Sequence, residues 1–456
     1  MDCQEIRRGQ NPYLNKKKRL VQPTISMEAP VKRDKATILI NQSTQMKLFK
    51  YLCLLAFAVA CTQCGPSDDM PNPNNLEFSC DDNPDVCELT AAQNQFGWNL
   101  FEKIYTETPD KNLFISPLSM AVALSMTANG ARGNTFSEME ATLEWAGNGI
   151  DPLNQRSEVL LEALPQLDQE VDLTIANSIW YRQEFPVEEA FLELNNTHYQ
   201  SEINPLDFAD PTAKETINNW VDDATNGLIE EIVEAINPDD IMFLINAIYF
   251  KGNWKYEFEE DKTEDGDFTL ADGTTQSTPF MKVEGANLDY FENLEVQAIR
   301  LPYADGAFGM TIILPKEQVA MSEVISDLQA NGLWEQIKEG SVEVESIVRM
   351  PKFTMEYEDR MNRFLIDLGM PLAFTNGGAD FSGIGPGGLF ISRVRHKAFV
   401  EVNEVGTEAA AVTSVAVTNE SASLSGFVNC DRPFLFVISD QSAESIQFVG
   451  HYSKPE

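Results

Sequence analysis

The pattern of apolar and polar positions predicts helices in the first part of the folded region. Thr90 has Gln93 three positions after it, as in a capping box, and apolar residues then recur at helical spacing. These apolar residues are Phe96, Leu100, Phe101 and Ile104. The pattern predicts an amphipathic helix that begins at Thr90.

Two further helices are predicted from the residues at their ends. Ser116 followed by Pro117 is a typical helix start, and the apolar run after it ends at Gly130. Apolar side chains occur on all sides of this run, which indicates a buried helix. Asp210-Pro211 and Asn226-Gly227 mark the ends of the other helix.

Strand patterns dominate later in the chain. The apolar runs VDLTIANSIWY (171–181) and MFLINAIYF (242–250) are typical of central strands in a large sheet. VQAIRLPY and FGMTIILP, separated by ADGA (304–307), predict a hairpin, and PFLFVIS with SIQFVGHYS predict a second one. VEVESIVRMPKFTMEYE and GLFISRVRHKAFVEVNE alternate as strands do. Helices early and strands late predict the α+β class.

One stretch, EVNEVGTEAAAVTSVAV (401–417), combines helix and strand preferences. Its first half, GTEAAA, favours helix, whereas VTSVAV alternates small and β-branched residues like a strand. From Ala409 to Asn419 there is no charge, glycine or proline, and such segments are aggregation hazards when exposed. The stretch is therefore either a buried strand or a loop that becomes one.

Composition and charge narrow the class of protein. A hydrophobic content of 43% in 456 residues is typical of a folded protein. The balance of 71 acidic against 33 basic residues gives a net charge of −38, which argues against nucleic acid as a partner. Acidity of this kind is typical of an extracellular protein that must stay soluble.

The N-terminal region predicts export. MKLFKYLCLLAFAVAC (46–61) has Lys47 and Lys50 before an apolar run too short to span a bilayer, so 46–60 is predicted to be a signal peptide. The residues AVAC (58–61) resemble a bacterial lipobox, in which Cys61 would be lipidated. Ordinary secretory cleavage after Ala60 is the alternative. Residues 1–45 are predicted to be a disordered upstream extension, with Met46 as the true start.

The remaining chain divides into a tether and one large domain. Residues 61–88 are rich in Pro, Asn and Asp, which predicts a tether, and an exported context permits a disulfide between Cys80 and Cys87 within it. Periodic patterns continue from 89 to 456 without a second linker, so this range is predicted to be one domain.

Several segments of 89–456 resemble the serpin family, in the family's order. NLFISPLSMAVALSMTANGARGNT resembles its second-helix signature, and WVDDATNGLI followed by INAIYFKGNWKYEF resembles its central strand and the segment before it. RVRHKAFVEVNEVGTEAAAVTS is similar to the strand that leads into the reactive loop, and RPFLFVI with SIQFVGHYSKP to the C-terminal hairpin. Trp220 and Trp254 also match family positions, although large aromatic residues are most often core.

The resemblance implies three β-sheets, about nine helices and an exposed reactive loop that inserts into the central sheet as a new strand. Alternation supports this, because one face of the inserted strand would carry only small or β-branched side chains, without charge or proline. That face comprises Thr407, Ala409, Ala411, Thr413, Val415 and Val417.

The resemblance also assigns site residues. The family's spacing from Glu404 places the reactive bond at Glu420–Ser421, with Thr418–Asn419 and Ala422–Ser423 as alternatives that would suit elastase-like proteases. Gly406 is expected to supply a turn that only glycine makes freely. The hinge comprises Glu404, Gly406, Thr407, Glu408, Ala409, Ala410 and Ala411, and the polar cluster beneath the opening strands comprises Ser116, Ser119, Asn246 and His396.

The implied function is suicide inhibition of serine or, as a second class, cysteine endopeptidases. The partner would be the target endopeptidase, bound as a covalent acyl-enzyme, and the chain a monomer whose loop could also insert into a neighbour's sheet to form polymers. The alternative is a non-inhibitory serpin that acts as a binding or chaperone-like protein. The inward-facing row of the hinge lacks the bulky, charged or proline residues common in non-inhibitory members, which favours inhibition.

An enzyme is not expected. The chain has only three histidines and no G-x-S-x-G, H-E-x-x-H or P-loop motif, so no catalytic residue, cofactor or metal ligand is predicted. The expected location is outside the cytoplasm, either lipid-anchored at a bacterial envelope or surface through Cys61, or extracellular.

Overall fold

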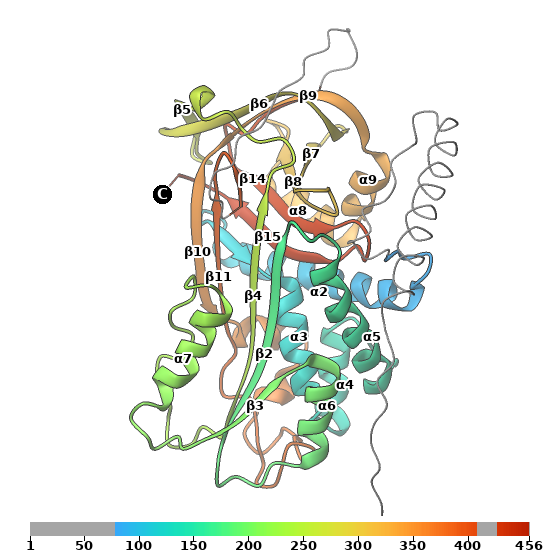
Figure 1. Cartoon of the computed structure of the whole chain (residues 1–456). Coiled ribbons are helices and arrows are strands. Elements are labelled where there is room, and N and C mark those ends of the chain that lie inside the picture. Colours follow the sequence, from blue (N-terminus) through green and yellow to red (C-terminus); the bar gives the residue numbers. More distant parts are fainter. Residues whose placement is uncertain (1–77, 408–425, 456) are drawn as a thin grey trace, which may run out of the picture. The chain divides into compact units, whose positions relative to one another are not determined.

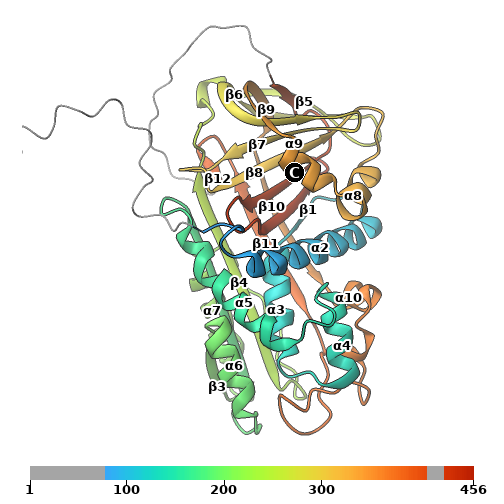
Figure 2. The same cartoon turned by 90° about the vertical axis from the view of Figure 1, so that its right-hand side faces the viewer.

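The structure, a computed structural model, describes residues 78–407 and 426–455, which form two β-sheets with helices packed around them (Figures 1 and 2). The described ranges contain nine α-helices and three short 3-10 helices. The predicted α+β class is confirmed. None of the helices described is long and apolar enough to cross a membrane.

The six-stranded sheet is antiparallel except for its last pair. In spatial order its strands are β10 (Phe353–Arg360), β11 (Arg395–Val402), β12 (Gly406–Thr407), β4 (Met242–Asn253), β2 (Asp172–Arg182) and β3 (Glu202–Leu206). The apolar runs expected to be central strands are β2 and β4, which pair along ten residues from Asp172↔Lys251 to Tyr181↔Met242.

The nine-stranded sheet contains both predicted hairpins. In spatial order its strands are β1 (Leu113–Ile115), β15 (Ile446–Tyr452), β14 (Phe434–Asp440), β8 (Phe308–Pro315), β7 (Val296–Pro302), β6 (Thr275–Glu292), β9 (Val342–Pro351) and β13 (Gly426–Asn429), with β5 (Glu264–Thr269) paired to β6. The pairs β7–β8 and β14–β15 are antiparallel, as predicted.

The expected three sheets appear as two hydrogen-bonded sheets among the described residues. The 18-residue β6 has an irregularity between Glu284 and Ala286, and it pairs with β5, β7 and β9 along its length. The β6–β9 ladder continues on both sides of this irregularity, with β5 paired before it and β7 after it, so β6 joins all of these strands into one sheet.

The helices cover both faces of the six-stranded sheet (Figure 2). The described α-helices are α2 (Pro84–Glu107), α3 (Pro117–Ala128), α4 (Gly133–Thr142), α5 (Ile150–Ala163), α6 (Glu189–Tyr199), α7 (Ala213–Ala224), α8 (Met321–Ala330), α9 (Leu333–Gly340) and α10 (Asn362–Leu368); the 3-10 helices are η1 (Leu164–Gln166), η2 (Glu260–Lys262) and η3 (Pro371–Phe374). Of these, α8 and α9 lie beside the nine-stranded sheet (Figure 2). On the α7 face, Ile217 and Val221 pack with Ile245 and Ala247 of β4. The main core lies on the opposite face, where α3 is buried as predicted.

The predicted start of the first helix at Thr90 is wrong. The helix α2 begins at Pro84 after Asn83, and the Thr90 hydroxyl donates instead to the backbone oxygens of Cys87 and Ala443. Cys80 and Cys87 form the disulfide that the sequence permits. Residues 78–88 therefore belong to the folded part rather than to the tether, because proline at the first helical position and the disulfide order them.

Candidate functional site

The two residues of β12 lie between β4 and β11 at one end of the six-stranded sheet. Thr407 is paired with Val402 of β11 on one side and with Gly252 of β4 on the other, antiparallel to both. The chain leaves β11, turns at residues 403–405 and starts back along the same strand. This geometry defines the register that any further residues of the same strand would adopt.

Beyond Thr407, no strand of the described residues lies between the edges of β4 and β11. Among the described residues, β4 pairs only with β2 and β12, and β11 only with β10 and β12. A cavity of about 550 Å³ lies between residues 242–248 of β4 and the chain from Pro386 to Lys397. A smaller cavity of about 20 Å³ lies next to Thr407. We call the gap between β4 and β11 the slot. The strand edges on its two sides can accept another strand.

The inner face of the slot is lined by alternate residues of its two edges. On β11, His396, Ala398, Val400 and Val402 are buried, whereas the residues between them are partly exposed. On β4, Ile245 and Ala247 face α7, so Leu244, Asn246 and Ile248 face the main core. A strand that continues from Thr407 in register would therefore point Thr407 and every second residue after it toward the core.

The four residues predicted to form a polar cluster lie close to the slot. The Ser116 backbone N–H donates to His396 Nε2 at 3.1 Å, and the Ser116 hydroxyl accepts from the Ser119 backbone N–H at 3.1 Å as the cap of α3. Ser119, Asn246 and His396 line the cavity. The structure thus joins Ser116, Ser119 and His396 directly and places Asn246 on the wall of the same cavity.

The protonation state of His396 follows from its surroundings. Complete burial lowers the pKa of His396 to about 4, because an apolar site disfavours the charged ring. Nε2 accepts the Ser116 N–H, so the proton of the neutral ring is on Nδ1. His396 is therefore a neutral hydrogen-bond acceptor that fixes the start of α3 against β11.

One polar residue of this cluster is absent from the sequence prediction. Asn177, opposite Asn246 on β2, accepts from Asn246 Nδ2 at 2.7 Å and donates to the Tyr199 carbonyl at 2.7 Å. The signal that could have found it is a buried-strand pattern with one amide in it, VDLTIANSIWY. The side-chain amide oxygen of Asn246, Oδ1, is buried and has no hydrogen-bond partner among the described residues.

The described part of the hinge is held by polar contacts. The Glu404 carboxylate accepts from Lys352 Nζ at 2.8 Å and from the Thr263 hydroxyl at 2.9 Å. Burial acts to raise the pKa of Glu404, but these hydrogen bonds and the Lys352 charge outweigh it, and the pKa lies below its usual value. Glu404 therefore stays ionised and ties the turn after β11 to the neighbouring sheet.

Gly406 is needed for a different reason from the predicted one. It is not among the glycines with positive φ, so the hinge makes no turn that requires glycine there. A Cβ at Gly406 would instead lie 2.2 Å from the Gly252 carbonyl oxygen and 2.8 Å from the Asn253 Cα. The close approach of two backbones is what excludes a side chain.

Thr407 rests on aromatic side chains. Its hydroxyl and that of Tyr303 are 2.6 Å apart, and the Tyr303 ring stacks on Trp254 with centroids 4.5 Å apart. The Trp254 indole donates to the Asn403 carbonyl at 2.9 Å. The match of Trp254 to a family position thus has a structural reason, since this residue holds the turn that precedes Gly406.

The remaining predicted site residues lie outside the described residues. They are Glu408, Ala409, Ala410 and Ala411 of the hinge, the reactive bond Glu420–Ser421 with its alternatives at Thr418, Asn419, Ala422 and Ser423, and the lipidation candidate Cys61.

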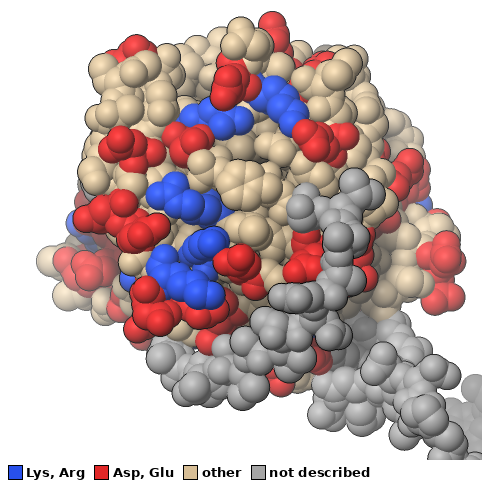
Figure 3. All heavy atoms as spheres, turned by 90° about the horizontal axis from the view of Figure 1, so that it is seen from above, with Lys and Arg blue, Asp and Glu red and all other residues tan. Residues whose placement is uncertain are grey.

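The end of the molecule at which β6 and β9 lie mixes basic and acidic side chains (Figure 3). Lys282 pairs with Glu284 at 2.8 Å and Lys262 with Glu259 at 2.7 Å. No group of three or more His, Cys, Asp or Glu that could hold a metal ion occurs in the described ranges. The feature of this structure that most resembles a functional site is therefore the slot with its hinge.

Comparisons with known proteins agree with this geometry. A family model described as "Serpin (serine protease inhibitor)" matches residues 91–455. Leukocyte elastase inhibitor of Homo sapiens is 33% identical over 380 residues, which cover 81% of this chain and all of that protein.

Two solved structures have the same fold. Tengpin, a thermophilic serpin in its native state, is 35% identical, with a TM-score of 0.72 over 80% of this chain and 93% of its own. Human thyroxine-binding globulin is 28% identical, with a TM-score of 0.74 over 81% of this chain and 99% of its own.

Proposed function

The chain belongs to the serpin family, and from that premise we propose that it is a suicide inhibitor of serine endopeptidases, with cysteine endopeptidases as a second class. The observation that carries this proposal is the slot, which begins directly after Thr407 and has, within the described ranges, an unpaired strand edge on each side. Its relative leukocyte elastase inhibitor is named as a protease inhibitor, which supports the same activity.

The proposed reaction begins with cleavage of the loop. The protease nucleophile attacks the carbonyl carbon of Glu420, the bond to the Ser421 nitrogen breaks, and the new amine leaves with a proton. Glu420 remains bound to the protease as an ester or thioester. The freed loop then enters the slot and carries the protease with it before water hydrolyses the acyl bond. New ladder hydrogen bonds and apolar burial supply the free energy.

The composition of the loop fits the geometry of the slot. In the register set by β12, every second residue from Thr407 to Val417 would point toward the core. Those from Thr407 to Thr413 would be level with the buried side chains of β11, whereas Val415 and Val417 would be level with the chain just before β11. These residues are small or β-branched, and none is charged. A charged residue in this row would have to be buried without a partner, which costs several kcal/mol.

A panel of proteases tests the proposal. The full chain is incubated with glutamyl-specific, elastase-like, trypsin-like and papain-like enzymes, and the products are examined on denaturing gels and by mass spectrometry. We expect a complex that survives SDS, and a released C-terminal peptide that begins at Ser421. Cleavage by every enzyme without a trapped complex would contradict the proposal for those classes.

A second candidate function is binding without inhibition. Thyroxine-binding globulin, which has the same fold, is solved with a small molecule, so serpin architecture also serves binding. If the chain acts in this way, loop cleavage would neither trap a protease nor raise thermal stability. The composition of residues 407–417 favours inhibition over this candidate.

We also propose that the mature protein is exported and attached to a bacterial envelope through a lipid on Cys61. The lipobox-like sequence before Cys61 supports this. Metabolic labelling with a fatty acid analogue in a bacterial host should label the wild-type chain and not Cys61→Ser. Equal labelling of both would contradict the anchor, and a labelled chain without export would contradict the location.

A further inference from the structure

A connector of residues 225–241 leads from α7 to β4 and packs on the outer face of the six-stranded sheet. Its Ile229 and Val233 pack with Ile245 and Ala247 of β4. The Asn218 side chain on α7 accepts from the backbone N–H of Val233 at 2.9 Å and donates to its carbonyl at 2.9 Å. The first half of the connector is thus fixed to α7 and β4, on one side of the slot.

Two arginines fix the second half of the connector to the other side of the slot. Arg393 Nη2 donates to Asp240 Oδ2 at 2.6 Å and to the Ala235 carbonyl at 2.8 Å. Arg395 Nη2 donates to Glu234 Oε1 at 2.8 Å and to Glu358 Oε1 of β10 at 2.6 Å. Both arginines belong to the chain that forms β11, so these contacts join the two edges of the slot.

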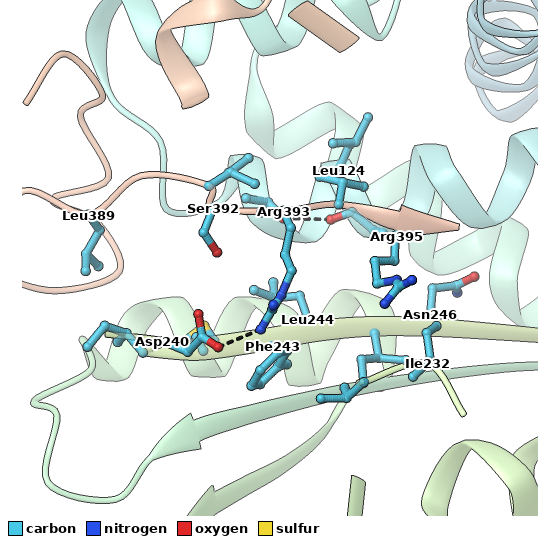
Figure 4. A pocket seen from close by; sticks show the side chains of 18 of the residues that line it. Leu124, Ile232, Asp240, Phe243, Leu244, Asn246, Leu389, Ser392, Arg393 and Arg395 are labelled. Carbon is cyan, nitrogen blue, oxygen red and sulfur yellow. Dashed lines mark hydrogen bonds and ion pairs between the residues drawn. The ribbon is translucent and has the colours of Figure 1, made fainter. Parts of the chain in front are cut away.

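Arg393 reaches across the cavity (Figure 4). Its side chain extends from the segment before β11 toward Asp240 and Phe243, and its guanidinium lies 5.7 Å from the centroid of the Phe243 ring on β4. In the register set by β12, Arg393 is also level with Phe243. Arg393 therefore occupies the outer layer of the slot at the height where an inserted strand would end.

Burial decides which of the two contacts matters more. The side chains of Arg393 and Asp240 are 19% and 8% exposed, whereas Glu234, the partner of Arg395, is 67% exposed. The Arg395 hydrogen bond lowers the pKa of Glu234, but water and salt screen an exposed pair. A shielded, charge-assisted pair is the stronger of the two, so Arg393 holds the connector more firmly than Arg395 does.

We propose that Arg393, assisted by Arg395, is a latch that fastens the connector across the slot and limits the rate at which a strand can enter its far end. Entry requires the Arg393 side chain to leave Asp240 and Phe243. The outward-facing side chains of an inserted strand would otherwise occupy the space that Arg393 fills on the outer side of the slot. This assignment rests on the proposed entry of a strand into the slot, but it does not depend on inhibition of any protease.

Strand entry can be measured without a protease. The full chain is mixed with a fluorescent synthetic peptide of the sequence GTEAAAVTSVAV, and uptake is followed by native gel and anisotropy. We expect Arg393→Met, which keeps the apolar stem, to take up the peptide about tenfold faster than wild type, since a charge-assisted hydrogen bond is lost. Arg395→Met should change the rate by less than about threefold.

The matched control is Arg182→Met. Arg182 donates from Nη2 to the Pro238 and Asp240 carbonyls at 2.7 Å, so it holds the same connector, but from β2 and without crossing the slot. Its rate of uptake should stay close to that of wild type. An equal acceleration in Arg182→Met would show that general loosening of the connector controls entry, and it would overturn the latch.

Hydrogen exchange gives a second readout that needs no strand entry. Arg393→Met should speed exchange of backbone amides in residues 234–241. Unchanged exchange, unchanged or slower uptake in this variant, or no uptake by any form of the chain would each overturn the assignment. The protease panel decides the proposed inhibition separately, so failure of the latch and failure of the function are distinguishable.

Discussion

His396 and Asn177 show how far a single residue beside the slot can be predicted from the sequence. A lone histidine in a strand pattern is most often an ordinary core residue, and only the family resemblance singled it out. Its partners, the Ser116 N–H and the cavity wall, could not be read from the sequence because they come from segments far apart in the chain. Asn177 carried a signal of its own, as one amide in an apolar strand.

Burial of His396 predicts a pH dependence of stability. Its pKa is about 4 when folded, against an ordinary value of 6.5, so between these values the unfolded chain binds a proton that the folded chain does not. The free energy of unfolding should therefore fall as the pH drops from 6.5 toward 4, by about 1.4 kcal/mol per pH unit for this residue.

The variant His396→Gln should lose that part of the slope. Urea unfolding between pH 7 and 4.5 measures it, and His198→Gln on α6 serves as a control with a partly exposed histidine. Parallel slopes in wild type and His396→Gln would show that His396 does not contribute.

Gly406→Ala tests the close approach of backbones at β12. A Cβ would meet the Gly252 carbonyl at 2.2 Å, and backbone cannot move aside as a flexible side chain can. We expect a loss of about 1–3 kcal/mol in the free energy of unfolding and faster amide exchange in residues 250–253. A variant with wild-type stability and exchange would mean that β12 does not lie between β4 and β11 in solution.

At the scale of elements, the sequence predicted most of the strands but only three of the nine described α-helices, where a local periodicity or end signal was present. The helix α3 begins after Ser116 with Pro117 first, and β2 and β4 follow their apolar runs. The alternating run 342–358 divides at Lys352 into β9 and β10, which belong to different sheets. The proposed latch was missed because residues 225–241 have no periodicity, and the arginines that hold them come from β11 and the segment just before it.

The disulfide Cys80–Cys87 defines the start of α2. The adjacent Thr90 and Asn94 donate to the backbone carbonyls of Ala443 and Glu444, so this end of α2 supports the turn between β14 and β15. Reduction should lower the free energy of unfolding by about 2–3 kcal/mol, the chain-entropy value for so short a loop.

Urea unfolding with and without reductant measures this effect. The variant Cys80→Ser/Cys87→Ser should unfold alike in both conditions, and at the reduced wild-type value. A reductant effect of equal size in the variant would assign the loss to other cysteines.

The whole molecule has a sheet with room for one more strand. Two edges of β4 and β11 face each other across a cavity, and the chain enters that gap at Thr407. Under the proposed mechanism, such a fold would gain stability when the slot is filled, because ladder hydrogen bonds would form on both edges and apolar side chains would be buried. The latch and the intact loop would then keep the fold in a kinetically trapped state.

The most direct test of this account is thermal unfolding of the full chain before and after a single cut within residues 408–425. About ten new ladder hydrogen bonds at about 1 kcal/mol each predict a rise in Tm of roughly 10 °C or more after the cut. In Thr413→Arg, which places a charge in the inward row level with His396, the rise should disappear. An unchanged Tm in the cut wild-type chain would contradict strand insertion and, with it, the proposed mechanism.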